Sequence, residues 1–169
     1  MRCAVPVRQV ELTLVHGGAI VEVVVRLYRR QTDSSGFLTP RVLARVFPDH
    51  GQFEDTVRFY EHVTGVRLDM DLDAREAGLY IVAVGPFLIL DLDPELLERA
   101  EQARQTPVTM IFSDLDSALA DSVANGAEIV AQPFAAPTGR GARIRHADGL
   151  LVEYLEHRPS PDDVDEPSL

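Results

Sequence analysis

The sequence has no lysine and no tryptophan, and all sixteen basic residues are arginine. The absence of lysine excludes a Schiff-base lysine, a P-loop lysine and a lysine general base. A single cysteine, Cys3, excludes an intramolecular disulfide and favours a cytoplasmic protein. The most apolar early stretch, residues 10–25, is interrupted by Glu11, His16 and Glu22 and lacks the layout of a signal peptide. We therefore expect no membrane-spanning segment.

Positive charge is also in short supply. The 169 residues include 27 acidic and 16 basic side chains, which gives a formal net charge of −11. A chain of this charge is repelled by nucleic acid and by anionic membranes, so we expect neither as a partner. The length fits one domain or two small modules.

The two ends of the chain differ from its centre. Residues 1–40 predict an N-terminal extension with two strands, 10–15 and 20–28, joined by a turn at His16-Gly17-Gly18, and then a polar linker over 31–40. The alternative, a poorly ordered or over-extended N-terminus, stays open. Residues 158–169 contain three prolines and four acidic residues, a composition typical of a disordered acidic tail.

The centre repeats one pattern of a strand, a helix and three strands. In the first copy we expect strands at 42–47, 67–72, 79–84 and 87–92, with a helix that ends at Gly65. A charged connector helix is expected at 93–105, opened by Asp93-Pro94. In the second copy we expect strands at 108–112, 128–132, 142–146 and 150–155, with a helix from Ser113 to Asn125. A repeated supersecondary unit indicates two modules that share a core.

Three segments of this repeat resemble the vicinal oxygen chelate superfamily, the group of glyoxalases, bleomycin-resistance proteins and extradiol dioxygenases. They are Val57-Arg58-Phe59-Tyr60-Glu61 with Thr64-Gly65, Phe112-Ser113-Asp114-Leu115-Asp116, and Asp148-Gly149 followed by Leu150–Tyr154. The resemblance covers residues 41–157 and divides them into module one (41–92), the connector (93–105) and module two (106–157). It implies an α+β fold in which two βαβββ modules form a cup-shaped mixed sheet, here with an N-terminal strand extension.

The resemblance also implies where a metal would bind. Members that use a metal place His, Gln or Glu on the first strand of each module and an acid on the last. Here the last strands offer Glu153 and, less exactly aligned, Asp91. The first strands offer Arg41, Leu43 and Arg45 in module one and Pro107, Thr109 and Ile111 in module two. None of these six is a normal ligand of a divalent metal, and arginine is a fixed cation that would repel one. We therefore predict no cofactor, with a divalent metal on Glu153 and Asp91 as the alternative, and Glu153 is the best candidate for a catalytic residue.

Strand alternation selects the residues that face the cup. On the last strand, Leu151, Glu153 and Leu155 share one face. The complete set of predicted ligand-binding residues is Arg45, Arg143, Arg145, Glu153, Leu43, Ile111, Leu151 and Leu155. Arginine suits a carboxylate or phosphate because its planar fork donates two parallel hydrogen bonds. The alternative, an internal ion pair between these arginines and Glu153 or Asp91, stays open.

Three functions follow from these features. The first is capture of a small organic molecule in the cup without a metal, as in sequestration or resistance proteins of the group. The second is a metal-dependent lyase, isomerase or dioxygenase of the same superfamily, so whether the protein is an enzyme stays open. The third is a regulatory or interaction module with a vestigial cup. The resemblance favours a homodimer in each case, and a small molecule is the expected ligand.

Overall fold

The computed structural model describes residues 15–16, 19–20, 25–49, 51–93 and 101–169. Its N-terminal part contains the paired strands β1 (Val15–His16) and β2 (Ala19–Ile20) and the separate strand β3 (Arg26–Arg29). Among all the residues that the structure describes, no helix is long and apolar enough to cross a membrane.

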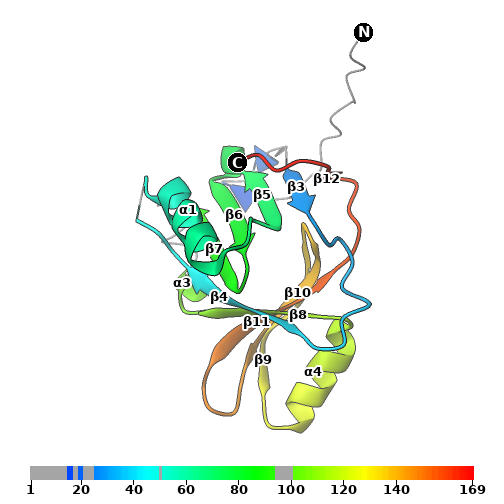
Figure 1. Cartoon of the computed structure of the whole chain (residues 1–169). Coiled ribbons are helices and arrows are strands. Elements are labelled where there is room, and N and C mark those ends of the chain that lie inside the picture. Colours follow the sequence, from blue (N-terminus) through cyan, green and yellow to red (C-terminus); the bar gives the residue numbers. More distant parts are fainter. Residues whose placement is uncertain (1–14, 17–18, 21–24, 50, 94–100) are drawn as a thin grey trace.

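The predicted repeat forms two βαβββ modules (Figure 1). Module one consists of β4 (Arg41–Val46), α1 (Phe53–Thr64), β5 (Met70–Ala74), the 3-10 turn η1 (Arg75–Ala77), β6 (Leu79–Val84) and β7 (Phe87–Leu92). Module two consists of β8 (Val108–Phe112), α4 (Leu115–Ala124), β9 (Glu128–Ala136), β10 (Gly139–Arg145) and β11 (Leu151–His157). The connector is described over α3 (Glu101–Arg104), and the rest of the helix expected there, 94–100, lies outside the described residues. The predicted α+β fold of two such modules is confirmed.

One curled sheet runs through both modules. Among the described residues it has ten strands in the order β12-β3-β5-β6-β7-β4-β8-β11-β10-β9. The first strands of the two modules, β4 and β8, are antiparallel neighbours at its centre, and each pairs in parallel with the last strand of its own module. The strand order β5-β6-β7-β4 of module one is therefore the mirror image of the order β8-β11-β10-β9 of module two. Backbone hydrogen bonds between β4 and β8 join the two modules into one sheet.

Each helix covers the convex side of its own half of the sheet. In module one, Phe53 and Val57 of α1 pack against Tyr80, Val82 and Ile89. The helix ends at Gly65, whose φ of 70° requires the left-handed conformation that glycine adopts without strain. Burial of one helix face against the sheet explains the spacing of its apolar residues.

In module two, Leu115 and Leu119 of α4 pack against Val152 and Tyr154. The cap of this helix is Asp114, which accepts a hydrogen bond from the Ser117 backbone, and not the predicted Ser113.

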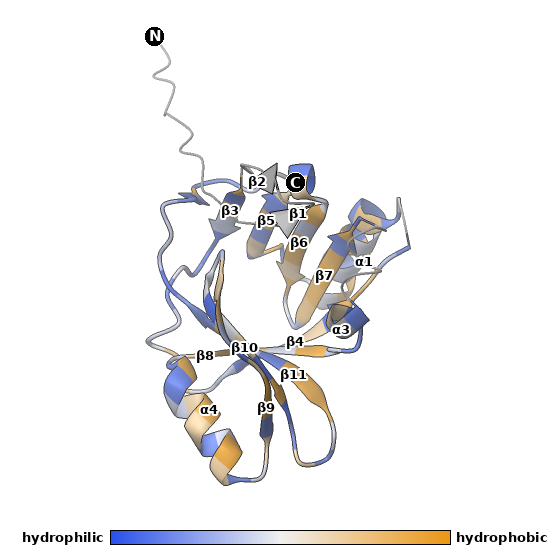
Figure 2. Cartoon of the chain, turned by 180° about the vertical axis from the view of Figure 1, so that it is seen from behind, coloured by the Kyte–Doolittle hydropathy of each residue, from blue (hydrophilic) through white to orange (hydrophobic). Residues whose placement is uncertain are grey.

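Strands β6 and β7 are apolar on both faces because both faces are covered. Tyr80 and Val82 face α1, whereas Leu79 and Ile81 face the concave side of the sheet. Figure 2 shows the resulting hydrophobic colour along both strands. A strand buried on both sides loses the alternation of polar and apolar residues, which is why β6 and the first four residues of β7 are continuous apolar runs in the sequence.

The tail does not match its prediction. Residues 158–169 are expected to be disordered, but the structure places β12 (Asp163–Val164) parallel to β3, at the edge of module one (Figure 1). The Asp163 carboxylate is bound by the guanidinium of Arg29, at 2.9 Å from Nε and from Nη2. The acidic composition suggested a solvated segment, but a buried arginine and a free strand edge supply the partners that hold it.

Candidate functional site

The concave face of the sheet encloses a cavity of about 400 Å³ between the two modules. Most of its wall is aliphatic, and module one contributes more of the aliphatic lining residues than module two. The apolar lining comprises Leu43, Met70, Leu72, Leu79, Ile81, Leu88, Leu90, Leu92, Ile111 and Leu155. The hairpin of β9 and β10 closes one side with residues 134–138, among them Phe134. Burying an apolar ligand against such a wall is favourable, since it removes apolar surface from water.

Charged groups gather at one end of this cavity. Arg45 forms an ion pair with Glu153 through Nη2, and its Nε donates to Thr109 Oγ1 at 2.8 Å. Its Nη1 donates to the Ala103 carbonyl at 3.3 Å. The Arg45 side chain is only 3% exposed and that of Glu153 is 15% exposed, so the pair is largely desolvated. Arg143 lies directly across the ladder from Glu153, and this end of the wall therefore carries two guanidiniums and one carboxylate.

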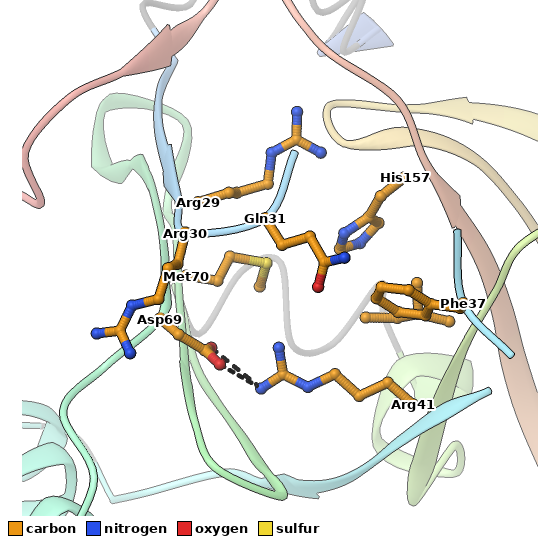
Figure 3. Close-up of a pocket in the computed structure, with 9 residues that line it drawn as sticks. Arg29, Arg30, Gln31, Phe37, Arg41, Asp69, Met70 and His157 are labelled. Carbon is orange, nitrogen blue, oxygen red and sulfur yellow. Dashed lines mark hydrogen bonds and ion pairs between the residues drawn. The ribbon is translucent and has the colours of Figure 1, made fainter. Parts of the chain in front are cut away.

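A second cavity, of about 290 Å³, adjoins the first (Figure 3). The two share Met70, Ile111 and His157 as lining residues. Arg41 borders the second cavity and binds the Asp69 carboxylate through Nη2, at 3.0 Å from Oδ1 and 2.9 Å from Oδ2. The same Nη2 donates to the Gly85 carbonyl at 2.7 Å.

His157 lies where the two cavities meet. It is 5% exposed, and among the described residues no partner bonds to its Nε2. Burial, and then the positive charges of Arg29 and Arg41, lower the pKa of His157 to about 3. The imidazole is therefore neutral at neutral pH, with one nitrogen that donates and one that accepts.

The structure brings most of the predicted ligand residues together. The larger cavity is lined by Leu43, Arg45, Ile111, Arg143, Glu153 and Leu155, all of which were predicted. Alternation on β11 is as expected, because Val152 and Tyr154 pack under α4 on the opposite face. His146 also lies on that opposite face, where its Nε2 is 2.8 Å from the Tyr154 hydroxyl.

Three predicted site residues lie outside the cavity. Arg145 and Leu151 are partners across the β10–β11 ladder, one row beyond Arg143 and Glu153 toward the turn that joins the strands. Arg145 is exposed, and its nearest partner is the Gly149 carbonyl at 3.4 Å. Both residues are on the predicted face of the sheet, but they lie beyond the end of the cup. Asp91 has the wrong parity, because its neighbours Leu90 and Leu92 are the residues that line the cavity.

The sequence reasoning missed His157 and the wall that module one supplies. The expected last strand ended at residue 155, whereas β11 continues to 157, and two more residues of the same alternation reach His157. The alternate residues of β6 and β7 were readable in the same way, since both strands were predicted with their observed bounds.

Comparison with known proteins supports the fold. No family model matches this sequence, and no curated protein matches it. Among solved structures, an uncharacterized protein from Methanosarcina mazei is 28% identical, with a TM-score of 0.59, over 72% of this chain and 94% of that one. Two βαβββ modules joined through their first strands, with the motifs of the superfamily at the expected places, decide the assignment. The chain has the vicinal oxygen chelate fold.

Weaker matches include enzymes. Methylmalonyl-CoA epimerase from Mycobacterium tuberculosis is 18% identical with a TM-score of 0.48, over 70% of this chain and 86% of that one. A variant of the Streptomyces coelicolor methylmalonyl-CoA epimerase is 16% identical with a TM-score of 0.45, over 67% and 91%.

The metal-binding positions implied for a vicinal oxygen chelate protein do not form a metal site here. The first strands present Arg45 and Thr109 to the cup, and the last strands present Leu90 and Glu153. The one carboxylate is already paired with Arg45, a fixed cation. Within the described ranges, no three His, Cys, Asp or Glu side chains lie close enough together to hold a metal ion. This donor set does not fit a divalent metal, which needs several oxygen, nitrogen or thiolate ligands.

Proposed function

We propose that this protein captures a small organic molecule in the cup of its vicinal oxygen chelate fold, without a metal. The observation that carries the proposal is the cavity of about 400 Å³, a size typical of ligand sites, with an aliphatic wall and a few polar groups at one end. Phe134 is the one Phe or Tyr among its described lining residues, so a saturated ligand body fits the wall better than a flat aromatic one.

The charged end of the cavity orients the ligand. Three nitrogens of Arg45 are occupied by Glu153, Thr109 and the Ala103 carbonyl. Glu153 and Arg143 lie beside Arg45 on the wall, directly across the β10–β11 ladder from each other, and a hydrogen-bonding group of the ligand would meet them there. An arginine and a carboxylate side by side suit a neutral group that both donates and accepts, such as a hydroxyl.

The alternative of a vestigial cup predicts that the arginines and Glu153 pair with one another and leave no room. The Arg45–Glu153 pair meets the first part of that expectation. The cavity beside the pair supports capture instead. The same proposal includes a cytoplasmic location, from the single cysteine, and no nucleic-acid or membrane partner, from the net charge of −11. It also includes a homodimer, which only the family resemblance implies.

A tryptophan reporter tests capture directly, because the chain has no tryptophan of its own. Leu79→Trp places the indole on the cavity wall, and Glu76→Trp places it on an exposed position of η1 as the matched control. We expect decanoate and decanol to shift the emission of the L79W variant saturably and to leave that of the E76W variant unchanged. If neither compound shifts the emission of L79W or raises the melting temperature of the natural chain, the capture proposal is wrong.

Metal analysis tests the other part of the proposal. The protein is purified without chelator or metal-affinity resin, beside a Glu153→Ala variant. We expect less than a tenth of an equivalent of Fe, Mn, Ni or Zn in both. One equivalent in the natural chain that is lost in the variant would establish the metal-dependent alternative.

A further inference from the structure

The smaller cavity is lined by polar side chains, among them Gln31 and Arg41, to which the function proposed above gives no role. It is bordered by the linker after β3, by β4 and by β11, and it opens onto the same Met70 and Ile111 that form the end of the aliphatic wall. A ligand that fills the cup therefore meets this second space at the end opposite Arg45. On β4, Arg41 and Arg45 lie four residues apart on one face, which spans about 13 Å of strand.

Three side chains converge in this space. Figure 3 shows Gln31, Arg41 and His157 directed toward one another across the cavity, whereas Arg30 extends its guanidinium away from it. The Nη2 atom of Arg41 is occupied by Asp69 and Gly85, and its other terminal nitrogen points toward the centre of the cavity (Figure 3). A planar guanidinium edge beside an amide and an imidazole is a set of donors that suits a carboxylate.

The buried imidazole of His157 independently indicates a ligand in this cavity. Its side chain is buried, yet among the described residues nothing bonds to Nε2. Buried polar atoms in native proteins nearly always have a hydrogen-bond partner, which is a protein atom, a water or a ligand. An imidazole nitrogen that is buried against two joined cavities and bonds to no described residue indicates that the partner lies in the cavity.

The net charges of the two ends do not distinguish them for an acidic group. In the smaller cavity Arg29 is paired with Asp163 and Arg41 with Asp69. At the other end of the cup Arg45 is paired with Glu153, and Arg143 lies across the ladder from the same carboxylate. The donors that converge in the smaller cavity are therefore what favours it for an acid.

We propose that the smaller cavity binds the acidic end of the ligand, a carboxylate held by Arg41, Gln31 and His157, while its aliphatic body lies in the cup. This inference rests on the proposed function and specifies its ligand class: an organic acid with a saturated body. A phosphate monoester shares the anionic chemistry, and the experiment separates the two.

Calorimetric titration with decanoate, decyl phosphate and decanol provides the test, on the natural chain and on four variants. Arg41→Gln and His157→Gln remove donors from the smaller cavity. Arg30→Gln is the matched control, since Arg30 borders the same cavity but its guanidinium extends away from it and donates to the Leu68 carbonyl at 3.4 Å. Arg143→Gln probes the opposite end.

We expect decanoate to bind about 10- to 100-fold more tightly than decanol, the effect of hydrogen bonds to a charged group. R41Q and H157Q should abolish that preference and leave decanol binding unchanged, and R30Q should retain it. R143Q, which removes a guanidinium from the cup itself, should weaken decanoate and decanol alike and so keep the preference. Tighter binding of decyl phosphate than of decanoate would assign the cavity to phosphate and overturn the carboxylate assignment.

Two further results separate the inference from the function it rests on. If R143Q abolishes the preference and R41Q does not, the acid binds at the other end, and the inference is wrong while capture stands. If no compound binds, both are wrong. Should H157Q fail to fold, NMR titration of the natural chain replaces it: bound decanoate should raise the pKa of His157, and an unchanged pKa would contradict the proposal.

Discussion

Arg45 illustrates, at the scale of a single residue, how the site and the stability of the fold depend on one another. Its side chain is almost fully buried, and it bonds to Thr109 on the neighbouring strand β8 and to Glu153 on β11, one strand farther along the sheet. Removing one partner of a buried ion pair leaves a charge without compensation. We expect Arg45→Met to lower the free energy of unfolding by about 3–5 kcal/mol, measured by urea titration followed by far-UV circular dichroism.

The double variant R45M/E153L is the control for this prediction. Replacing both charges by apolar groups of similar size is often neutral or stabilising, so we expect it to recover most of the loss. A double variant as unstable as R45M alone would show that the guanidinium acts through packing and not through its charge.

His157 makes stability depend on pH. Its pKa is 6.5 in the unfolded chain and about 3 in the folded protein. Below pH 6.5 the unfolded chain binds a proton that the folded protein does not, so stability falls as the pH falls from 6.5 toward 3. Between pH 7 and pH 5 this group should cost about 2 kcal/mol.

The variant His157→Gln isolates that contribution. Asp71 and Asp162, whose pKa values are raised by burial, change stability in the opposite direction, so the difference between the natural chain and H157Q is the informative quantity. We expect the loss of unfolding free energy between the two pH values to be smaller in H157Q. Equal losses would mean that His157 is protonated in the fold.

Sequence alternation predicted individual site residues well where the strand bounds were correct. It placed Glu153 and Leu155 in the cavity. It wrongly included Arg145, because alternation gives the face of the sheet on which a residue lies but not how far the cavity extends along the strand. It fell short at His157 because a charged and aromatic ending, Glu156-His157-Arg158, looks like a loop when the groups that cover it are unknown.

At the scale of elements, the β9–β10 hairpin depends on a close approach to β11. A Cβ at Gly139 would lie 2.1 Å from the Glu156 carbonyl oxygen, and φ there is +143°. We expect Gly139→Ala to destabilise the protein by about 2–4 kcal/mol through contact and backbone strain, measured by urea titration. Gly36→Ala, where nothing lies within 4 Å, should change stability by less than about 0.5 kcal/mol. Similar effects of both variants would contradict the close approach.

One buried arginine binds the tail, in addition to the backbone pairing of β12 with β3. Arg29 donates to Asp163, to the Thr138 carbonyl at 3.0 Å and to the Arg158 carbonyl at 2.9 Å, so it joins the tail, the hairpin and β3. We expect Asp163→Asn to cost about 1–3 kcal/mol in urea titration, because a charged partner of a buried guanidinium is lost. Asp165→Asn, on an exposed neighbour, should have no measurable effect. Identical stability of D163N and the natural chain would mean that the tail contributes nothing.

The elements themselves were largely readable. Strands β6, β7 and β8 have the bounds that their apolar runs predicted, and α1 ends at its glycine. The tail was not readable, since its acidic and proline-rich composition is the same whether or not a distant arginine awaits it. Long-range partners of this kind are absent from any local pattern.

At the scale of the whole molecule, the pairing of β4 with β8 makes the two modules one mechanical unit. Neither module can unfold without breaking the backbone hydrogen bonds between β4 and β8. We expect a single unfolding transition, with the far-UV circular dichroism and the near-UV signal of the aromatic side chains, which both modules contain, changing at the same urea concentration. Two separated midpoints would show that the modules unfold independently.

The neighbours β3 and β12 have a consequence for synthesis. Arg29 and Asp163, which bind one another, are separated by 134 positions in the chain. A ribosome adds roughly 5–20 residues per second, so the outer edge of module one waits roughly 7–27 seconds for its covering strand. During that interval a nascent chain exposes unpaired backbone of β3 and a buried-type arginine without its counterion. This edge is thus completed only after the residues of β12 are synthesised, and a chain stalled before Asp163 presents an open strand edge to the cell's chaperones.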